Sequence, residues 1–256
     1  MVIAWRGDAE LKKLFTTTAS SIVAATTSAV SFAGLMVIAS PTWCAPPLVT
    51  DDAGTLAPGA CQFETEHRQF RNRIEQDIVP VCNLWFDTEV GIGYQRIAPD
   101  GAPRADSIVY QFKKVLTTSG ETGWAFGINA ATVRASGRQS GTRQNIFNAL
   151  VSRQFSANAL HLNAGFVSNR EAETGTHKNR LSWGIAAEHE ATDHWTFVGE
   201  VFGQRYIPAT VQVGLRFWAL PKYMQLTSSL GALRGKGGDG RWVSFGVRFE
   251  TGGSIF

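Results

Sequence analysis

The side chains that could carry catalysis or bind a metal are scattered along this sequence. No GxSxG nucleophile elbow, phosphate-binding loop, HExxH zinc signature or CxxC pair is present. The five histidines are His67, His161, His177, His189 and His194. Metal ligands must converge on one ion, whereas His189 and His194 straddle an expected turn. The sequence therefore predicts no metal site, no cofactor and no enzyme. A lipid-modifying enzyme that uses His189 on an outer face is the enzymatic alternative.

Charged side chains recur at every second position of the predicted strands, on the same face as small and amide side chains. They are candidates for the lining of a lumen: Glu64, Glu66, Arg68, Glu89, Lys113, Glu188, Glu200, Arg216 and Arg248. His161 shares this parity and is expected to be a hydrogen-bonded pore residue. Because the charges have both signs, they form either ion pairs that fix strand register or a charged constriction that a solute passes. Glu200 and Arg216, on neighbouring strands, are the pair expected to matter most.

Alternation of apolar with polar residues extends from about residue 60 to the end, and no window has an apolar stripe at helical spacing. Clusters of Gly, Pro, Asn and Asp separate the segments. The pattern predicts an all-β fold of twelve strands, at about 61–70, 73–82, 87–97, 105–117, 122–134, 143–155, 158–169, 179–190, 194–205, 209–219, 222–232 and 241–250. Segments of about ten residues are typical of tilted membrane-spanning strands.

The connections between these strands alternate in length, with 71–72 and 206–208 as short exceptions on the longer side, and this pattern favours an up-and-down transmembrane β-barrel. Bacterial outer-membrane barrels have short periplasmic turns and longer extracellular loops, and an even strand number puts both termini in the periplasm. Trp and Tyr residues gather at both strand ends, as interfacial girdles would. A soluble β-protein is the alternative, but its surface would rarely carry so large an apolar patch. Twelve strands predict a narrow or plugged lumen.

Composition excludes several other classes. Of the 256 residues, 44% are apolar and 18% are charged, against about 25% charged in soluble domains. These values exclude disorder and a coiled coil, and a single apolar stretch near the N-terminus excludes a bundle of membrane helices. The formal net charge is +3, and the sequence has no block of basic residues, so it does not indicate a nucleic-acid-binding surface.

The N-terminal region has the order of a secretory signal. Lys12 and Lys13 precede an uncharged run that ends in small residues and Pro46–Pro47. We expect residues 1–45 to be a signal peptide cleaved within 39–45, residues 46–60 a periplasmic lead-in and residues 61–256 the barrel. A retained membrane anchor is the alternative for the first segment. The expected partners are outer-membrane lipid, the barrel-insertion machinery and a small solute.

Two cysteines fall within the expected barrel. If the chain turns near Arg71–Asn72, Cys61 and Cys82 lie opposite one another on adjacent strands, at the spacing that a cross-strand disulfide needs. An oxidising periplasm permits such a bond. A disulfide and a pair of free buried thiols both remain open.

One segment carries a family resemblance. Residues 47–55, Pro-Leu-Val-Thr-Asp-Asp-Ala-Gly-Thr, followed by Gln62-Phe63-Glu64, resemble the start of the MetA-pathway-of-phenol-degradation family. Further blocks agree in order, at residues 88–94, 111–113, 161–166, 183–188 and 213–217. From the residues alone, 51–55 read as an Asx-type turn before the first strand.

The resemblance implies an outer-membrane transporter of Gram-negative bacteria, proposed to take up aromatic or other hydrophobic compounds. We expect a channel for small solutes. The alternatives are a sealed structural or surface-interaction barrel and the lipid-modifying enzyme.

Overall fold

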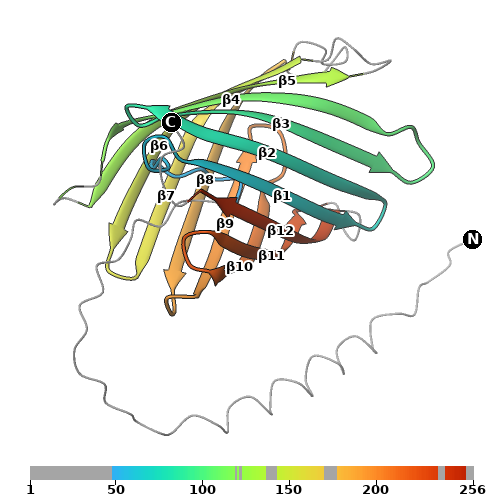
Figure 1. Ribbon diagram of the computed structural model, residues 1–256. Helices are drawn as coiled ribbons and strands as arrows, with labels where there is room; N and C mark the ends of the chain where they lie inside the picture. The colour runs from blue at the N-terminus through green and yellow to red at the C-terminus, as the bar shows by residue number, and fades with distance from the viewer. Residues whose placement is uncertain are drawn as a thin grey trace, which may run out of the picture. The chain divides into compact units, whose positions relative to one another are not determined.

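The computed structural model describes residues 48–118, 120, 123–136, 143–169, 178–235 and 240–251. The expected signal peptide, residues 1–45, and His177 lie outside these residues. Twelve strands follow one another along the chain (Figure 1). They are β1 (Cys61–Phe70), β2 (Arg73–Trp85), β3 (Thr88–Pro99), β4 (Ala105–Thr117), β5 (Trp124–Ser136), β6 (Arg143–Phe155), β7 (Asn158–Asn169), β8 (Asn179–Glu190), β9 (Trp195–Gln204), β10 (Thr210–Leu220), β11 (Met224–Leu233) and β12 (Arg241–Glu250).

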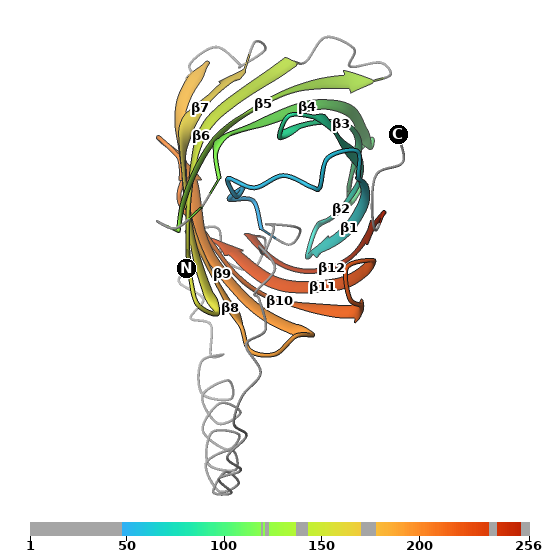
Figure 2. The same cartoon turned by 60° about the vertical axis from the view of Figure 1, so that its left-hand side comes forward.

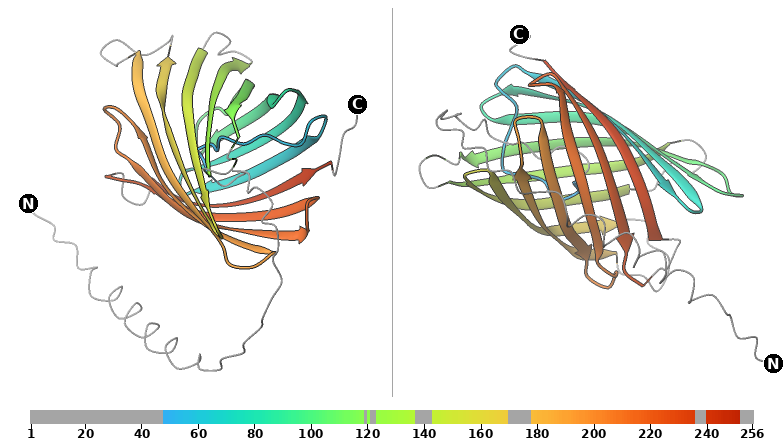
Figure 3. Two further views of the ribbon diagram at one scale, coloured as in Figure 1. Left: turned by 90° about the vertical axis from the view of Figure 1, so that its left-hand side faces the viewer. Right: turned by 90° about the horizontal axis from the view of Figure 1, so that it is seen from below.

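The strands close into one antiparallel barrel. Each strand pairs with its neighbours in sequence, and β12 returns to pair with β1 from Gln62↔Glu250 to Phe70↔Trp242. Two perpendicular views show the closed wall (Figure 3). The predicted all-β, twelve-stranded antiparallel barrel is confirmed. No helix within the described ranges is long and apolar enough to cross a membrane.

Strand boundaries differ from the prediction mainly between β2 and β3. The prediction ended the second strand at Cys82, because Asn83 and Asp87 favour turns, but β2 continues through Trp85. The turn is only Phe86–Asp87, with φ angles of 49° and 52°. Positive φ at both central residues is the geometry of a tight hairpin that suits strand twist. A register shift between Asn83 and Trp85 accommodates the extra residue.

The two faces of the wall have opposite character, as the alternation predicted. Large apolar side chains are exposed all around the outer surface of the barrel. Among them are Phe63, Ile92, Phe126, Phe166, Ile185, Phe197, Val213, Leu230 and Phe245. Buried polar or charged side chains lie on the opposite parity, including Glu89, Glu188, Gln212, Arg216, Ser244 and Arg248. The hydrophobic surface of this fold is therefore outside and the polar surface inside.

Residues 48–60 are named here the inserted segment. Residues 46–60 were expected to be a periplasmic lead-in, and the view along the barrel shows residues 48–60 inside the lumen (Figure 2). Thr50, Asp52, Ala53 and Leu56 are each at most 3% exposed. The lumen is lined with hydrogen-bonding groups, so a polar peptide can satisfy its backbone there.

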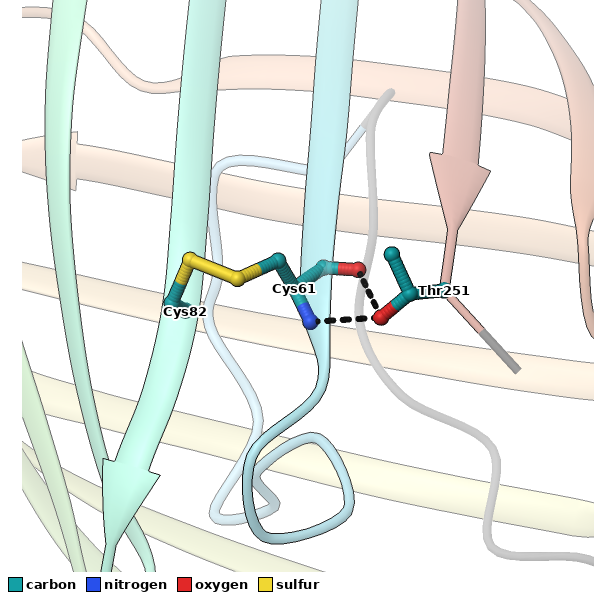
Figure 4. The surroundings of a disulfide bond; sticks show 3 residues. All are labelled: Cys61, Cys82 and Thr251. Atoms are coloured by element: carbon teal, nitrogen blue, oxygen red, sulfur yellow. Dashed lines mark hydrogen bonds between the residues drawn. A yellow bond between two sulfur atoms is a disulfide. The ribbon is translucent and has the colours of Figure 1, made fainter. Parts of the chain in front are cut away.

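The start of the barrel is fastened on both sides of Cys61 (Figure 4). Cys61 and Cys82 form a disulfide between β1 and β2, with Cα atoms 4.0 Å apart at directly paired positions. On the β12 side, the Cys61 N–H donates to Thr251 Oγ1 at 2.9 Å, and the Thr251 N–H donates to the Cys61 carbonyl at 2.8 Å. Three adjacent strands are thus joined at one end.

Candidate functional site: the lumen and its inserted segment

The inserted segment is attached to β9 by one carboxylate. Glu200 accepts the Val49 N–H on Oε1 and the Thr50 N–H on Oε2, each at 2.8 Å. Gly184 on the adjacent β8 leaves room for this turn of chain, because a Cβ at that position would come within 2.4 Å of Thr50 Oγ1. A charged acceptor bound to two backbone N–H groups is a strong attachment, since charge-assisted hydrogen bonds exceed neutral ones.

A second attachment involves Lys113 on β4. Its ammonium lies 2.9 Å from Asp51 Oδ1, 2.7 Å from Asp52 Oδ1 and 3.9 Å from Glu89 Oε2. Asn129 on β5 donates to the other Asp51 oxygen at 2.8 Å. The Asp52 side chain is only 2% exposed and that of Lys113 is 12% exposed. Charges this deeply buried need partners, so the lysine and the two aspartates depend on one another.

The remaining attachments bring the segment to the end of the barrel that carries the short turns. The Ala53 N–H donates to Ser152 Oγ on β6 at 2.8 Å, and the Leu56 N–H donates to Glu89 Oε1 on β3 at 2.5 Å. Asn83 Nδ2 on β2 donates to the Leu56 carbonyl at 2.6 Å. The segment therefore bonds to strands from β2 to β9 and crosses the lumen between them.

Arg216 and Glu188 form a separate buried ion pair. Arg216 Nη1 donates to Glu188 Oε2 at 2.8 Å, and both side chains are 1% exposed. His161 lies beside them, with Nε2 at 3.6 Å from Glu188 Oε1 and Nδ1 at 2.8 Å from Ser152 Oγ. The pair expected from the sequence was Glu200 with Arg216. The register places Glu200 opposite Gln212 and Arg216 opposite Thr196. Arg216 bonds the glutamate of β8, and Glu200 bonds the inserted segment.

A third charged group occupies β1 and β2. Arg68 Nη2 lies 2.5 Å from Glu66 Oε2 and 3.9 Å from Asp77 Oδ2, while Nη1 lies 3.4 Å from Glu75 Oε2. Arg248 on β12 pairs with Glu250, and its Nε lies 3.7 Å from Glu64 Oε1. The ten predicted lumen residues thus lie on the inner wall, in the charged groups on β12, β1 and β2, at the inserted segment or around Glu188.

Three cavities lie between the inserted segment and the wall. One of about 340 Å³ is bounded by Thr50, Asp51, Glu89, Lys113 and Asn148, among others. Another, of about 230 Å³, lies at Glu64, Glu66, Arg68 and Asp77, and a third, of about 240 Å³, lies between β6 and β10. Leu48 or Val49 borders each of them, so the inserted segment shapes the space that a solute could occupy.

The four histidines that the structure describes do not gather into a site. His189 Nδ1 lies 3.0 Å from Asn158 Oδ1, and His194 Nδ1 lies 2.7 Å from the Trp218 carbonyl. Within the described ranges, no group of three His, Cys, Asp or Glu side chains could hold a metal ion. The lipid-modifying alternative rested on His189, whose ring is oriented by an amide.

Sequence reasoning missed the residues that hold the inserted segment. Asn83, Asn129 and Ser152 were not candidates, although each bonds to it. Residues 51–55 were noted only as a turn. The available signal was two adjacent aspartates before the first strand, together with one lumen-facing lysine.

Comparison with known proteins gives one family. Residues 34–250 match the family described as "Uncharacterised conserved protein UCP029691". The chain belongs to this family. This match does not confirm the MetA-pathway family that the motifs resemble, and that resemblance stays a prediction. No curated protein matches the UCP029691 chain.

Solved structures similar to this UCP029691 member include porins. The KdgM porin in complex with disordered oligogalacturonate aligns with a TM-score of 0.60 at 7% identity, over 73% of this chain and 98% of that one. The NanC porin aligns with a TM-score of 0.57 at 9% sequence identity, over 74% of this chain and 98% of the porin. Outer membrane phospholipase A from Escherichia coli aligns with a TM-score of 0.46 at 11% sequence identity, over 76% of this chain and 91% of the phospholipase. A likeness this weak carries no argument about activity. At these identities the likeness establishes the fold alone.

Proposed function

We propose that this protein is an outer-membrane channel for small solutes, whose lumen is narrowed by the inserted segment. The observation that carries the proposal is the sidedness of the wall. Ile185, Phe197 and Val213 are each about half exposed on the outside, while Arg216 and Gln212 are 1% exposed within. An apolar belt around a polar lumen suits a barrel wetted by lipid. The porin fold of the similar structures supports the same conclusion.

The proposed orientation follows from the connections. Turns such as Phe86–Asp87 lie at the same end as Cys61 and Thr251. Most of the longer connections lie at the other end, where residues 71–72 form a short exception. Short turns in this class face the periplasm. We therefore assign both ends of the barrel chain, and the inserted segment, to the periplasmic side.

The solute class is narrower than the resemblance implied. Charged and amide groups, among them Glu64, Arg68, Gln111 and Asn148, line these cavities beside apolar side chains. Polar solutes can replace the hydration of such groups, whereas a hydrophobic solute would leave them without partners. We propose small polar solutes as the main class. Uptake of aromatic compounds rests on the MetA-pathway resemblance.

The experiment is reconstitution of the purified protein into planar bilayers and liposomes. We expect small conductance steps, and faster liposome swelling in arabinose than in protein-free liposomes. Deletion of residues 48–57 should enlarge the steps. Phenol uptake tests the aromatic class separately. Absence of conductance and of swelling, in both wild type and the deletion variant, would overturn the channel proposal.

A sealed barrel is the second candidate, and the inserted segment is the observation that favours it. Its hydrogen bonds to Glu200, Ser152 and Asn83 cross the lumen from several sides. In a sealed barrel, the segment would contribute to stability alone. The deletion variant would then unfold at lower denaturant concentration, and wild type would conduct nothing.

A further inference from the structure

One end of the barrel carries an excess of positive charge on its outer surface. It is named here the loop end, and it has the connections 71–72, 100–104, 137–142, 170–178, 205–209 and 234–240. The described basic residues that lie in these connections or point outward beside them are Arg71, Arg96, Arg104, Arg134, Lys178, Arg205, Arg234 and Arg241, against the acidic Asp100 and Asp106. At the short-turn end, the same selection gives Lys114, Arg153 and Lys222 against Asp87 and Asp193. The positive excess is therefore a property of the loop end.

Arg134 has no acidic partner among the described residues. It lies on the outer face of β5, because it has the parity of Phe126, which is 45% exposed. The Arg134 side chain is exposed, and its guanidinium carbon lies 5.9 Å from the ring centre of Tyr110 on β4. Tyr110 is itself 45% exposed. The charge of Arg134 is thus accessible from outside the barrel.

Two further arginines lie near Arg134 and share one carboxylate. Arg96 Nε on β3 lies 2.9 Å from Asp106 Oδ1, and Arg104 Nε lies 3.7 Å from Asp106 Oδ2. The Arg104 side chain remains 65% exposed. Arg96 also donates to Tyr94 Oη at 2.7 Å, and the strand register places Tyr94 level with Arg134, two strands away. One carboxylate for three guanidinium groups leaves a positive surplus over β3 to β5.

Arginines also lie at the loop end over β9 to β12. The guanidinium carbon of Arg205 lies 4.9 Å from the ring centre of Tyr206. Arg241 begins β12 on the same face as Phe245, which is 60% exposed, and Arg234 follows β11. All three arginines are exposed, and none forms an ion pair with a described residue. The charge over β3 to β5 therefore belongs to a wider basic zone.

The position of this zone selects the kind of partner. Its side chains point away from the lumen, so a solute inside the barrel does not meet them. They border the apolar outer surface, and tyrosines lie beside them, as at the headgroup level of a membrane. Arginine binds phosphate through two parallel N–H donors, and basic clusters beside a membrane span bind anionic lipid headgroups. A phosphate on a lipid headgroup fits both the charge and the place.

We propose that Arg96, Arg104 and Arg134 bind the phosphate groups of lipopolysaccharide, the phosphorylated glycolipid of the outer leaflet. Arg104 and Arg134 supply guanidinium donors, while Arg96 stays on Asp106 and adds its field. The acyl chains lie against the apolar outer face of β3 to β5. The inference goes beyond the channel function and rests on the proposed orientation, which places the loop end in the outer leaflet.

The test measures displacement of a fluorescent lipid A from the full barrel in detergent micelles. The competitors are diphosphoryl lipid A, monophosphoryl lipid A and phosphatidylethanolamine. We expect diphosphoryl lipid A to bind at least about tenfold more tightly than phosphatidylethanolamine, with the monophosphoryl form between them. Equal binding of the three lipids would overturn the inference. Displacement by excess inorganic phosphate would show a site for free anions and overturn the assignment to a lipid.

Variants locate the site. Arg134→Gln and Arg104→Gln should each weaken binding of diphosphoryl lipid A by about fivefold. Arg153→Gln is the matched control, because Arg153 is an exposed arginine 4.9 Å from an aromatic ring, that of Trp124, at the short-turn end. Arg104→Gln keeps the test decisive if Arg134→Gln fails to fold, because Arg104 lies in a connection. Equal weakening in Arg134→Gln and Arg153→Gln, or unchanged binding in both Arg134→Gln and Arg104→Gln, would refute the placement.

Conductance separates this inference from the channel proposal, because lipid binding in micelles requires no transport. A barrel that prefers diphosphoryl lipid A and conducts nothing would refute the channel and support the lipid site. A conducting barrel that binds the three lipids equally would refute the lipid site and support the channel.

Discussion

Lys113 Nζ lies between Asp51 Oδ1 at 2.9 Å and Asp52 Oδ1 at 2.7 Å, and it thereby connects the inserted segment to the barrel wall. The lysine also lies 3.9 Å from Glu89, which accepts the Leu56 N–H. Removing one partner of a buried ion pair typically costs about 3–5 kcal/mol. Here the protein can avoid that cost by releasing the segment, because the barrel wall has its own strand pairing.

Lys113→Met should therefore loosen the segment and leave the barrel folded. We expect larger conductance steps and faster protease cleavage within residues 48–60. Lys114→Met is the matched control, because Lys114 donates instead to the Phe86 carbonyl at the hairpin turn. Identical cleavage and conductance in the two variants would show that the lysine does not hold the segment.

A designed cross-link tests whether the segment leaves the lumen. The Cβ of a residue at 184 would lie 3.3 Å from Thr50 Cβ, close to the separation of about 3.5–4.5 Å found in disulfides. Thr50→Cys/Gly184→Cys should cross-link and hold conductance at a low level until a reductant is added. The Thr50→Cys single variant should show no such dependence. Equal conductance before and after reduction would mean that the segment is static.

If lipid surrounds the apolar outer surface, the loss of unfolding free energy caused by an outward-facing charge should depend on its depth in the bilayer. Ile185 lies in the middle of β8 and Leu181 near its end, on the same face, 49% and 59% exposed. In a bilayer, Ile185→Lys should cost about 2–4 kcal/mol and Leu181→Lys about 0–1 kcal/mol. Unfolding of the reconstituted protein in urea measures both. Equal costs would contradict lipid contact.

The Cys61–Cys82 bond closes a loop over a sequence separation of 21 residues. Chain-entropy arguments give about 3 kcal/mol for a loop of that length. Cys61→Ser/Cys82→Ser should lose about that much free energy of unfolding and yet remain a barrel, since β1 and β2 stay paired. Reductant added to wild type should give the same decrease. A larger loss, with disappearance of heat-modifiable migration, would mean that the disulfide is needed for folding.

Close backbone contact gives one further test of packing. A Cβ at Gly165 would lie 1.9 Å from the Phe147 carbonyl oxygen, whereas at Gly199 the nearest atom is 4.0 Å away. Gly165→Ala should therefore cost about 1–3 kcal/mol, and Gly199→Ala should be close to neutral. Chemical unfolding of the two alanine variants provides the comparison.

Much of the wall was predictable because strand alternation is a local signal. Within the seven residues Thr88–Tyr94, outward apolar and inward polar or small side chains already alternate. The ten residues predicted for the lumen lie on the inner wall. The inserted segment was not predictable in the same way. Its attachment to Glu200 spans 150 residues in sequence, and a run of turn-forming residues looks the same inside a lumen or outside it. The sequence places Glu200 and Arg216 on neighbouring strands, but it does not give the register, which sets Glu200 opposite Gln212 and Arg216 opposite Thr196.

The return of β12 to β1 leaves the described sheet without a free edge. Unpaired edges are where sheets of separate molecules join and aggregate, so two copies of this protein cannot associate by extending one another's strands. Association through the outer surface of the described strands would instead use side chains, and its strength would depend on the lipid or detergent that competes for that surface.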